Sequence, residues 1–141
     1  MKKTLFISFI LSIFLLSWCT NQNKTSSNKF SFDINISKLD YSLPKYTKLC
    51  IPNKKQMCSD NGCEDIQPTV FLAYDEDNNL IYRCDNKPCD SYKVKVSQSW
   101  IYTYIEPTNP RGFSVKISND NKYIETVSIG LNTLVSYGVC K

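Results

Sequence analysis

The chain has 141 residues, of which 42% are apolar and 13% aromatic, a composition typical of one globular domain of modest size. Its formal net charge is +4, and two of those charges belong to Lys2 and Lys3, which leaves too little for a general nucleic-acid binder. The sequence contains no histidine, which excludes histidine-dependent nucleophiles and histidine acid–base catalysis. We therefore expect a protein that is not an enzyme and that uses no cofactor.

The N-terminus has the pattern of an export signal. Lys2 and Lys3 precede an apolar stretch from Leu5 to Trp18, and polar residues dominate from Thr20 onward. As a helix, this stretch would span roughly 22 Å, short of the roughly 30 Å hydrocarbon core of a bilayer. Residues 1–19 are therefore predicted to be a signal peptide, and the protein is predicted to reach the periplasm or the outer cell envelope.

The end of this segment allows two outcomes. Residues 16–19, LSWC, resemble the bacterial lipobox at the Leu, Ser and Cys positions, with Trp18 where that pattern has a small residue. The resemblance implies lipidation of Cys19 and attachment to a membrane. The alternative is ordinary cleavage after Cys19, because Ser17 and Cys19 are small residues at the positions that signal peptidase reads.

A tether follows the signal segment. Residues 20–29, TNQNKTSSNK, contain no apolar side chain and are predicted to be a flexible linker that reaches roughly 17 Å. Residues 30–141 then form a single predicted domain.

The cysteines indicate a disulfide framework. With Cys19 set aside, six remain, which suits an oxidising compartment. CSDNGC (58–63) and CDNKPC (84–89) each enclose four turn-forming residues, so hairpin loops should pair Cys58 with Cys63 and Cys84 with Cys89. By elimination, Cys50 pairs with Cys140. The rival interpretation is a zinc site made by the two C-x4-C pairs.

Alternating apolar and polar residues predict an all-β domain. The clearest cases are Phe30, Phe32, Ile34 and Ile36 in one segment and Phe113, Val115 and Ile117 in another. The expected strands are 30–37, 69–74, 80–84, 92–97, 99–105, 113–118, 123–129 and 133–139. They predict a small antiparallel meander, as a sandwich or barrel, stapled by disulfides.

The stretch WIYTYI is predicted to be a central strand within 99–105. Trp100, Tyr102 and Tyr104 would then share one face, and Ile101 and Ile105 the other. The three aromatic residues either pack in the core or form a binding face for sugars or a protein partner.

Three consecutive acidic residues, Asp75, Glu76 and Asp77, could supply carboxylates for glycoside hydrolysis or Ca²⁺ binding. Because they lie in the turn-like sequence DEDNN, we expect a solvated turn instead.

Two resemblances suggest a setting for the domain. The runs YRCDNKPCDSY (82–92) and VSYGVCK (135–141) resemble small uncharacterised secreted proteins of Gram-negative bacteria, which brings no activity with it. Ser99-Trp100-Ile101-Tyr102 is similar to the Ser-Gly-x-x-Tyr inhibitory loop of membrane-bound inhibitors of c-type lysozyme, with Trp100 at the Gly position and Tyr102 one residue closer to the Ser than the Tyr of that loop. That family implies an envelope lipoprotein with an antiparallel β-barrel and a Cys near the C-terminus. The sequence therefore predicts a binding or structural module of the envelope, with inhibition of a secreted hydrolase such as lysozyme as the alternative.

Overall fold

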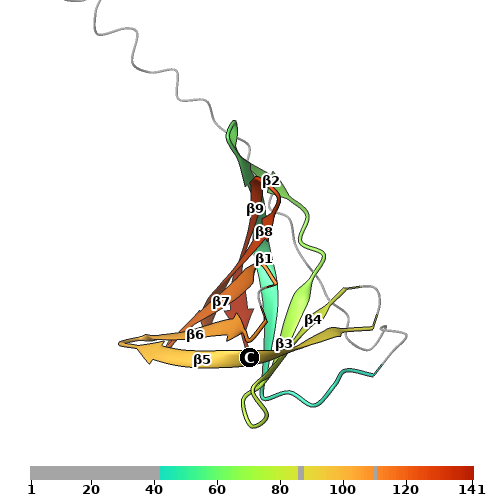
Figure 1. Ribbon diagram of the computed structural model, residues 1–141, viewed down its shortest axis with the longest axis vertical. Helices are drawn as coiled ribbons and strands as arrows, with labels where there is room; N and C mark the ends of the chain where they lie inside the picture. Colours follow the sequence, from blue (N-terminus) through green and yellow to red (C-terminus); the bar gives the residue numbers. More distant parts are fainter. Residues whose placement is uncertain (1–41, 86–87, 110) are drawn as a thin grey trace, which may run out of the picture.

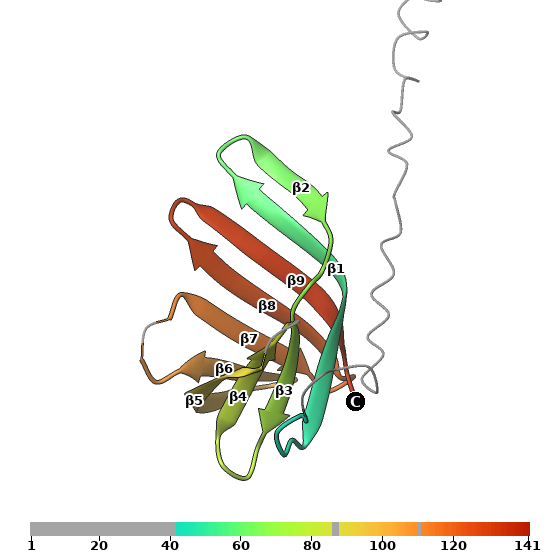
Figure 2. The ribbon, with the colours of Figure 1, turned by 90° about the vertical axis from the view of Figure 1, so that its right-hand side faces the viewer.

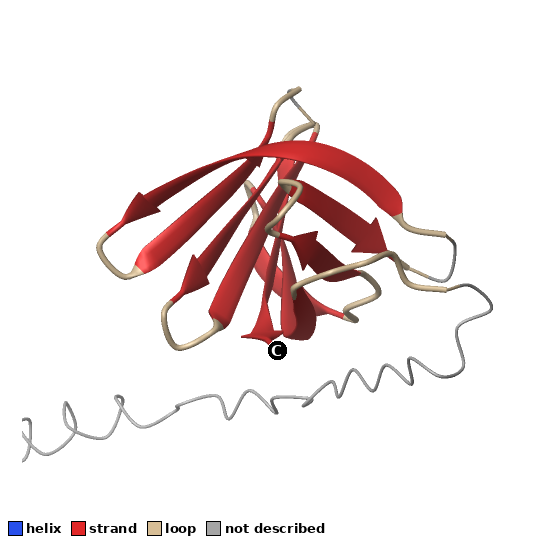
Figure 3. Ribbon diagram, turned by 90° about the horizontal axis from the view of Figure 1, so that it is seen from below, coloured by secondary structure: helices blue, strands red, loops and turns tan. Residues whose placement is uncertain are grey.

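The structure, a computed structural model, describes residues 42–85, 88–109 and 111–141. These residues form nine strands and no helix, so the predicted all-β fold is confirmed (Figures 1 and 3). The strands are β1 (Lys48–Ser59), β2 (Gly62–Ile66), β3 (Phe71–Asp75), β4 (Leu80–Cys84), β5 (Asp90–Ser99), β6 (Tyr102–Pro107), β7 (Phe113–Ser118), β8 (Lys122–Ile129) and β9 (Asn132–Cys140). A helix able to cross a membrane is accordingly not found in these ranges.

The strands make one antiparallel sheet that closes on itself. From β3 to β9 each strand pairs with the next along the chain, and β1 closes the ring by pairing with both β3 and β9 (Figure 2). β2 lies outside this eight-stranded ring, because it pairs only with the second half of β1. Of the two predicted β architectures, the barrel is therefore the correct one.

The inner face of the barrel follows the alternation seen in the sequence. On β7, Phe113, Val115 and Ile117 are buried in the core, while the residues between them face outward. The core continues around the ring with Leu72, Tyr74, Ile81, Val94, Ile105, Tyr123 and Val127. These side chains come from β3 to β8, so closure of the ring is what buries them together.

Gly138 allows close packing between β1, β8 and β9. It lies opposite Tyr123 in the β8–β9 register, and a Cβ atom at this position would approach Cε1 of Tyr123 to 2.6 Å and the carbonyl oxygen of Ile51 to 2.1 Å. No side chain fits in that space. The ring of Tyr123 fills it from the neighbouring strand instead, as aromatic residues do beside strand glycines.

Two parts of the strand prediction need correction. β1 and β2 are absent from it. The bulge between Pro52 and Lys54 interrupts the alternation of β1, and β2 has no buried residue. The predicted strand 99–105 starts too early: β6 begins at Tyr102, and Trp100 and Ile101 form a turn. The predicted strand 30–37 lies outside the described residues.

Candidate functional site

The most unusual local feature is the two-residue turn between β5 and β6. Ser99 pairs with Tyr102, so Trp100 and Ile101 form the tip of the hairpin. Trp100 has φ of 56° and its side chain is fully exposed. A positive φ at the first central residue is the pattern of a type II′ turn, which favours Gly at that position. The hairpin connecting β8 and β9 has the same register pattern and places Gly130, with φ of 61°, there.

Beyond the tip, the aromatic side chains of β6 lie on the outside of the barrel. Ile105 is buried in the core, and Tyr102 and Tyr104 therefore face the opposite way. Their rings pack edge to face with centroids 6.4 Å apart. The predicted face of Trp100, Tyr102 and Tyr104 thus points away from the core. The two tyrosines are half-buried, and none of the three residues belongs to the core cluster.

Lys116 on β7 completes this aromatic surface. Its Nζ lies 4.0 Å from the ring centroid of Tyr102 and 5.2 Å from that of Tyr104, which is cation–π geometry. Among the described residues, Lys116 makes no ion pair with a carboxylate. Sequence analysis did not single out Lys116, because its position opposite Tyr104 follows only from the β6–β7 register.

A groove of about 430 Å³ lies beside the turn, along β6, β7 and β8. Its lining includes Ile101, Tyr102, Lys116, Asp120, Lys122 and Ile124. The backbone N–H of Asn119 donates to the carbonyl oxygen of Ile101 at 2.9 Å, which ties the tip to the β7–β8 turn. Apolar and charged side chains therefore line the groove together.

Two of the charged residues in the groove, Asp120 and Lys122, form an ion pair. Lys122 lies 2.6 Å from the Asp120 carboxylate, and the Ser118 hydroxyl also donates to that carboxylate. These contacts, with Lys122 the larger cause, lower the pKa of Asp120 to about 2, and the same pair raises the pKa of Lys122. The carboxylate of Asp120 thus neutralises the charge of Lys122, whereas Lys116 has no carboxylate partner among the described residues.

The lumen contains a second group of polar residues. Arg83 on β4 donates from Nε to Oε1 of Glu125 on β8 at 2.7 Å, and its guanidinium carbon lies 5.4 Å from the centroid of the Phe113 ring. Glu125 is only 2% exposed. Burial lowers the pKa of Lys55, which also faces this pair. The Tyr123 hydroxyl is buried, and burial raises its pKa.

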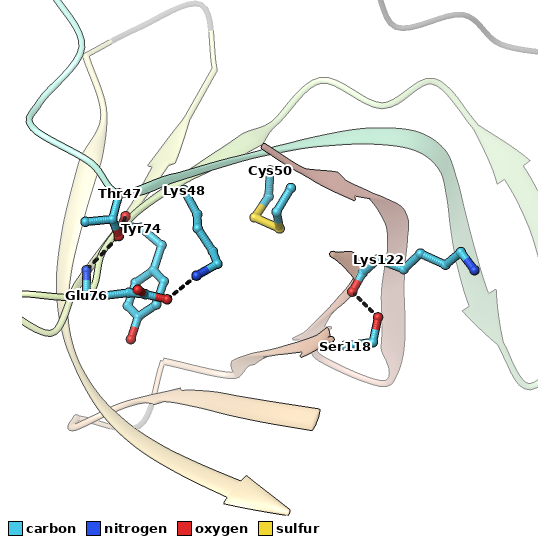
Figure 4. The surroundings of a disulfide bond; sticks show 8 residues. Thr47, Lys48, Cys50, Tyr74, Glu76, Ser118 and Lys122 are labelled. Carbon is cyan, nitrogen blue, oxygen red and sulfur yellow. Dashed lines mark hydrogen bonds and ion pairs between the residues drawn. A yellow bond between two sulfur atoms is a disulfide. The ribbon is translucent and has the colours of Figure 1, made fainter. Parts of the chain in front are cut away.

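The predicted solvated turn at residues 75–77 is correct for Glu76 and Asp77, which are exposed, and wrong for Asp75, which is the last residue of β3 and is buried. Asp75 accepts hydrogen bonds from the backbone N–H and the side-chain amide of Asn78, and these bonds lower its pKa. Glu76 pairs with Lys48, and Asp77 with Lys45. Figure 4 shows the Lys48–Glu76 pair beside Tyr74 at one mouth of the barrel. Within the part of the chain that the structure describes, no group of three acidic, Cys or His residues is placed to hold a metal.

The six cysteines form the three predicted disulfides, Cys50–Cys140, Cys58–Cys63 and Cys84–Cys89. The zinc alternative is therefore wrong, because all four of its ligands are consumed in disulfides. Cys50 and Cys140 are directly opposed in the β1–β9 pairing, where their bridge closes the ring (Figure 4). Three disulfides are compatible with an extracytoplasmic location. The candidate lipidation site, Cys19, lies outside the described residues.

Comparison with protein-family models, curated proteins and solved structures gives no significant match. The fold defines the protein as a closed, eight-stranded up-and-down barrel with an additional hairpin strand. Its function therefore has to be inferred from the Trp100 tip and the groove.

Proposed function

We propose that the protein is an exported, non-enzymatic binding module of the cell envelope, and that its ligand binds at the Trp100 tip and the adjoining groove. The observation that carries this proposal is the full exposure of Trp100 at a turn position with positive φ. Exposed aromatic residues dominate the energetics of many recognition surfaces.

The proposal accounts for a residue that folding alone disfavours. A non-glycine residue in the left-handed region costs on the order of 1 kcal/mol. Leaving a large apolar side chain in water forgoes a further gain of roughly 2 kcal/mol from burial. Because Trp100 supports neither the turn nor the core, contact with a partner offers the best physical reason for its presence.

The envelope location rests on the signal pattern of residues 1–19 and is compatible with the three disulfides. Mass spectrometry of the N-terminus tests it. A diacylglyceryl group on Cys19 would mean a membrane-anchored form, and a free Thr20 a soluble one. An intact Met1 in protein recovered from its native host would contradict export with processing.

Photo-crosslinking tests the binding surface directly. A benzoyl-phenylalanine residue would replace Trp100 in the full chain expressed in cells, and the control would carry it at Leu131. Leu131 is also fully exposed, but it lies at the opposite end of the barrel. Adducts specific to position 100 are expected. Equal adducts at both positions, or neither protein nor lipid adducts at position 100, would reject this surface.

Inhibition of lysozyme is the second candidate function, and one observation favours it. Ser99–Tyr102 forms an exposed tip on a closed antiparallel barrel, and residue 100 has the backbone conformation that favours Gly. The Gly of the Ser-Gly-x-x-Tyr loop would therefore suit this turn. Purified protein should inhibit a c-type lysozyme if this candidate is correct, and lack of an effect at micromolar concentration would discard it.

A further inference from the structure

We propose that the Trp100 tip docks on the surface of a phospholipid bilayer, with Lys116 beside an anionic head group. This inference rests on the proposed binding role of the tip and names its partner as a lipid surface. A protein partner at the same tip is the competing outcome of the test below.

The hairpin tip has the composition of a segment that enters the membrane interface. Residues 97–104, SQSWIYTY, contain no charged side chain, and the charged side chains at the adjoining β7–β8 turn, Asp120 and Lys122, form an ion pair with each other. Trp and Tyr prefer the interface, where an aromatic ring meets lipid while its polar atoms stay hydrated. Interfacial segments reach roughly 5–10 Å into the head-group region, about the reach of a two-residue turn and its side chains.

The backbone of the tip is suited to the same environment. Unpaired N–H and C=O groups are costly in lipid. In this hairpin, Ser97 pairs with Tyr104, Gln98 with Thr103 and Ser99 with Tyr102, and the carbonyl of Ile101 accepts from Asn119. Most polar groups of the hairpin backbone are therefore satisfied internally before any contact with lipid.

Lys116 supplies a positive charge next to the tip. Its ammonium lies over the Tyr102 and Tyr104 rings and has no carboxylate partner among the described residues. Near an anionic bilayer, a Lys contributes about 1 kcal/mol of attraction. Lys122 contributes less, because Asp120 lies 2.6 Å from its ammonium.

Attachment through the N-terminal segment would allow even a weak contact between the Trp100 tip and the bilayer to persist. Residues 1–19 are expected to engage a membrane, and a lipid on Cys19 would keep the domain within the reach of the 20–29 tether. A tethered domain meets the bilayer at high effective concentration, so a tip with marginal affinity would still be held there.

The other apolar tip differs in its surroundings. Leu131 is fully exposed in the β8–β9 turn, but that end of β9 pairs with the end of β1, next to the β1–β2 hairpin. The hairpin carries Asp60, Glu64 and Asp65. Asp65 pairs with Lys54 at 3.3 Å, whereas none of the ion pairs among the described residues involves Asp60 or Glu64. Anionic lipid would repel these two carboxylates, which makes the Leu131 tip a suitable control.

Brominated lipid tests the proposal on the full chain. Trp18 and Trp100 are the only tryptophans, so Trp18→Phe leaves Trp100 as the sole emitter. The variant would be reconstituted into vesicles of phosphatidylcholine with phosphatidylglycerol, with or without bromine on the acyl chains. We expect a blue shift of the Trp100 emission and strong quenching by the brominated chains. Adding Lys116→Ala should weaken the quenching, and more so in vesicles with phosphatidylglycerol than in phosphatidylcholine alone.

The control places a single tryptophan at the opposite tip, with Trp18→Phe, Trp100→Phe and Leu131→Trp combined, and its emission should not be quenched. Equal quenching at the two tips, or none at Trp100, would overturn the bilayer proposal. If Trp100 is not quenched while photo-crosslinks at position 100 capture a protein, bilayer docking is wrong and the binding role stands. If both measurements fail, the binding role falls as well.

Discussion

Arg83 and Glu125 join opposite walls of the barrel through a hydrogen-bonded ion pair of 2.7 Å. Around the closed ring, β4 and β8 are separated by three strands in either direction, so the pair crosses the lumen. The pair therefore occupies part of the interior, which in some eight-stranded barrels holds a small ligand. The outside of this barrel is therefore the more suitable place for binding.

Glu125→Gln should destabilise the fold strongly. The substitution leaves the Arg83 charge without its partner, and breaking a buried pair from one side costs about 3–5 kcal/mol. Denaturant unfolding measures the effect. Glu76→Gln is the matched control, because Glu76 pairs with Lys48 near the surface, and it should change the free energy of unfolding by about 1 kcal/mol or less. Similar losses in the two variants would show that the lumen pair has no special role.

The three disulfides should contribute unequally. Cys50 and Cys140 are 90 residues apart in sequence, whereas the partners of each other bridge are five apart. In the chain-entropy model, the long bridge contributes about 4.5 kcal/mol and a short one roughly 2. Replacing Cys50 and Cys140 by Ala should thus lower the midpoint of denaturation more than replacing Cys58 and Cys63. The reverse order would indicate that the β1–β2 hairpin, not closure of the ring, limits stability.

Asp120 should make the fold sensitive to strong acid. Its pKa falls from 3.8 to about 2 on folding, mainly because of Lys122. As the pH drops between these values, the unfolded chain takes up a proton before the folded one does, so this stabilisation is present above pH 3.8 and is lost toward pH 2. Asp120→Asn should flatten the fall of the unfolding free energy with pH in that range. An identical pH profile for the variant would contradict the assignment.

Trp100→Gly should separate stability from binding. Gly at residue 100 relieves the positive φ, as Gly130 does in the equivalent turn, so the free energy of unfolding should be unchanged or higher by about 0.5–1 kcal/mol. Binding at the tip should be lost in the same variant. Thermal unfolding and photo-crosslinking from a neighbouring position measure the two effects. A variant that unfolds more easily would mean that Trp100 has a structural role.

Sequence patterns predicted much of the fold because most strands have one buried and one wet face. β7 alternates strictly, and the first six residues of β8 follow the same rule. β1 was not predicted because its bulge at Pro52 shifts the alternation of inward and outward side chains partway along the strand. The disulfide pairing could be predicted because each of the two short loops pairs its own flanking cysteines. Cys50 and Cys140 are then the two cysteines that remain.

Only part of the candidate site could be predicted from the sequence. The aromatic run around Trp100 stood out, but WIYTYI has strong strand character, and a positive φ at Trp100 cannot be read from residue types. Lys116 became part of the site only through the β6–β7 pairing, which places it opposite Tyr104. This register is set by the way two consecutive strands pair, and the residue types of either strand alone do not encode it.

The exposure of Trp100 is the central claim, and collisional quenching measures it most directly. In the protein carrying Trp18→Phe, free in solution, acrylamide should quench Trp100 almost as efficiently as it quenches a free tryptophan derivative, and the emission should be that of an indole in water. A blue-shifted emission that resists acrylamide would place Trp100 inside the fold and would contradict the binding tip.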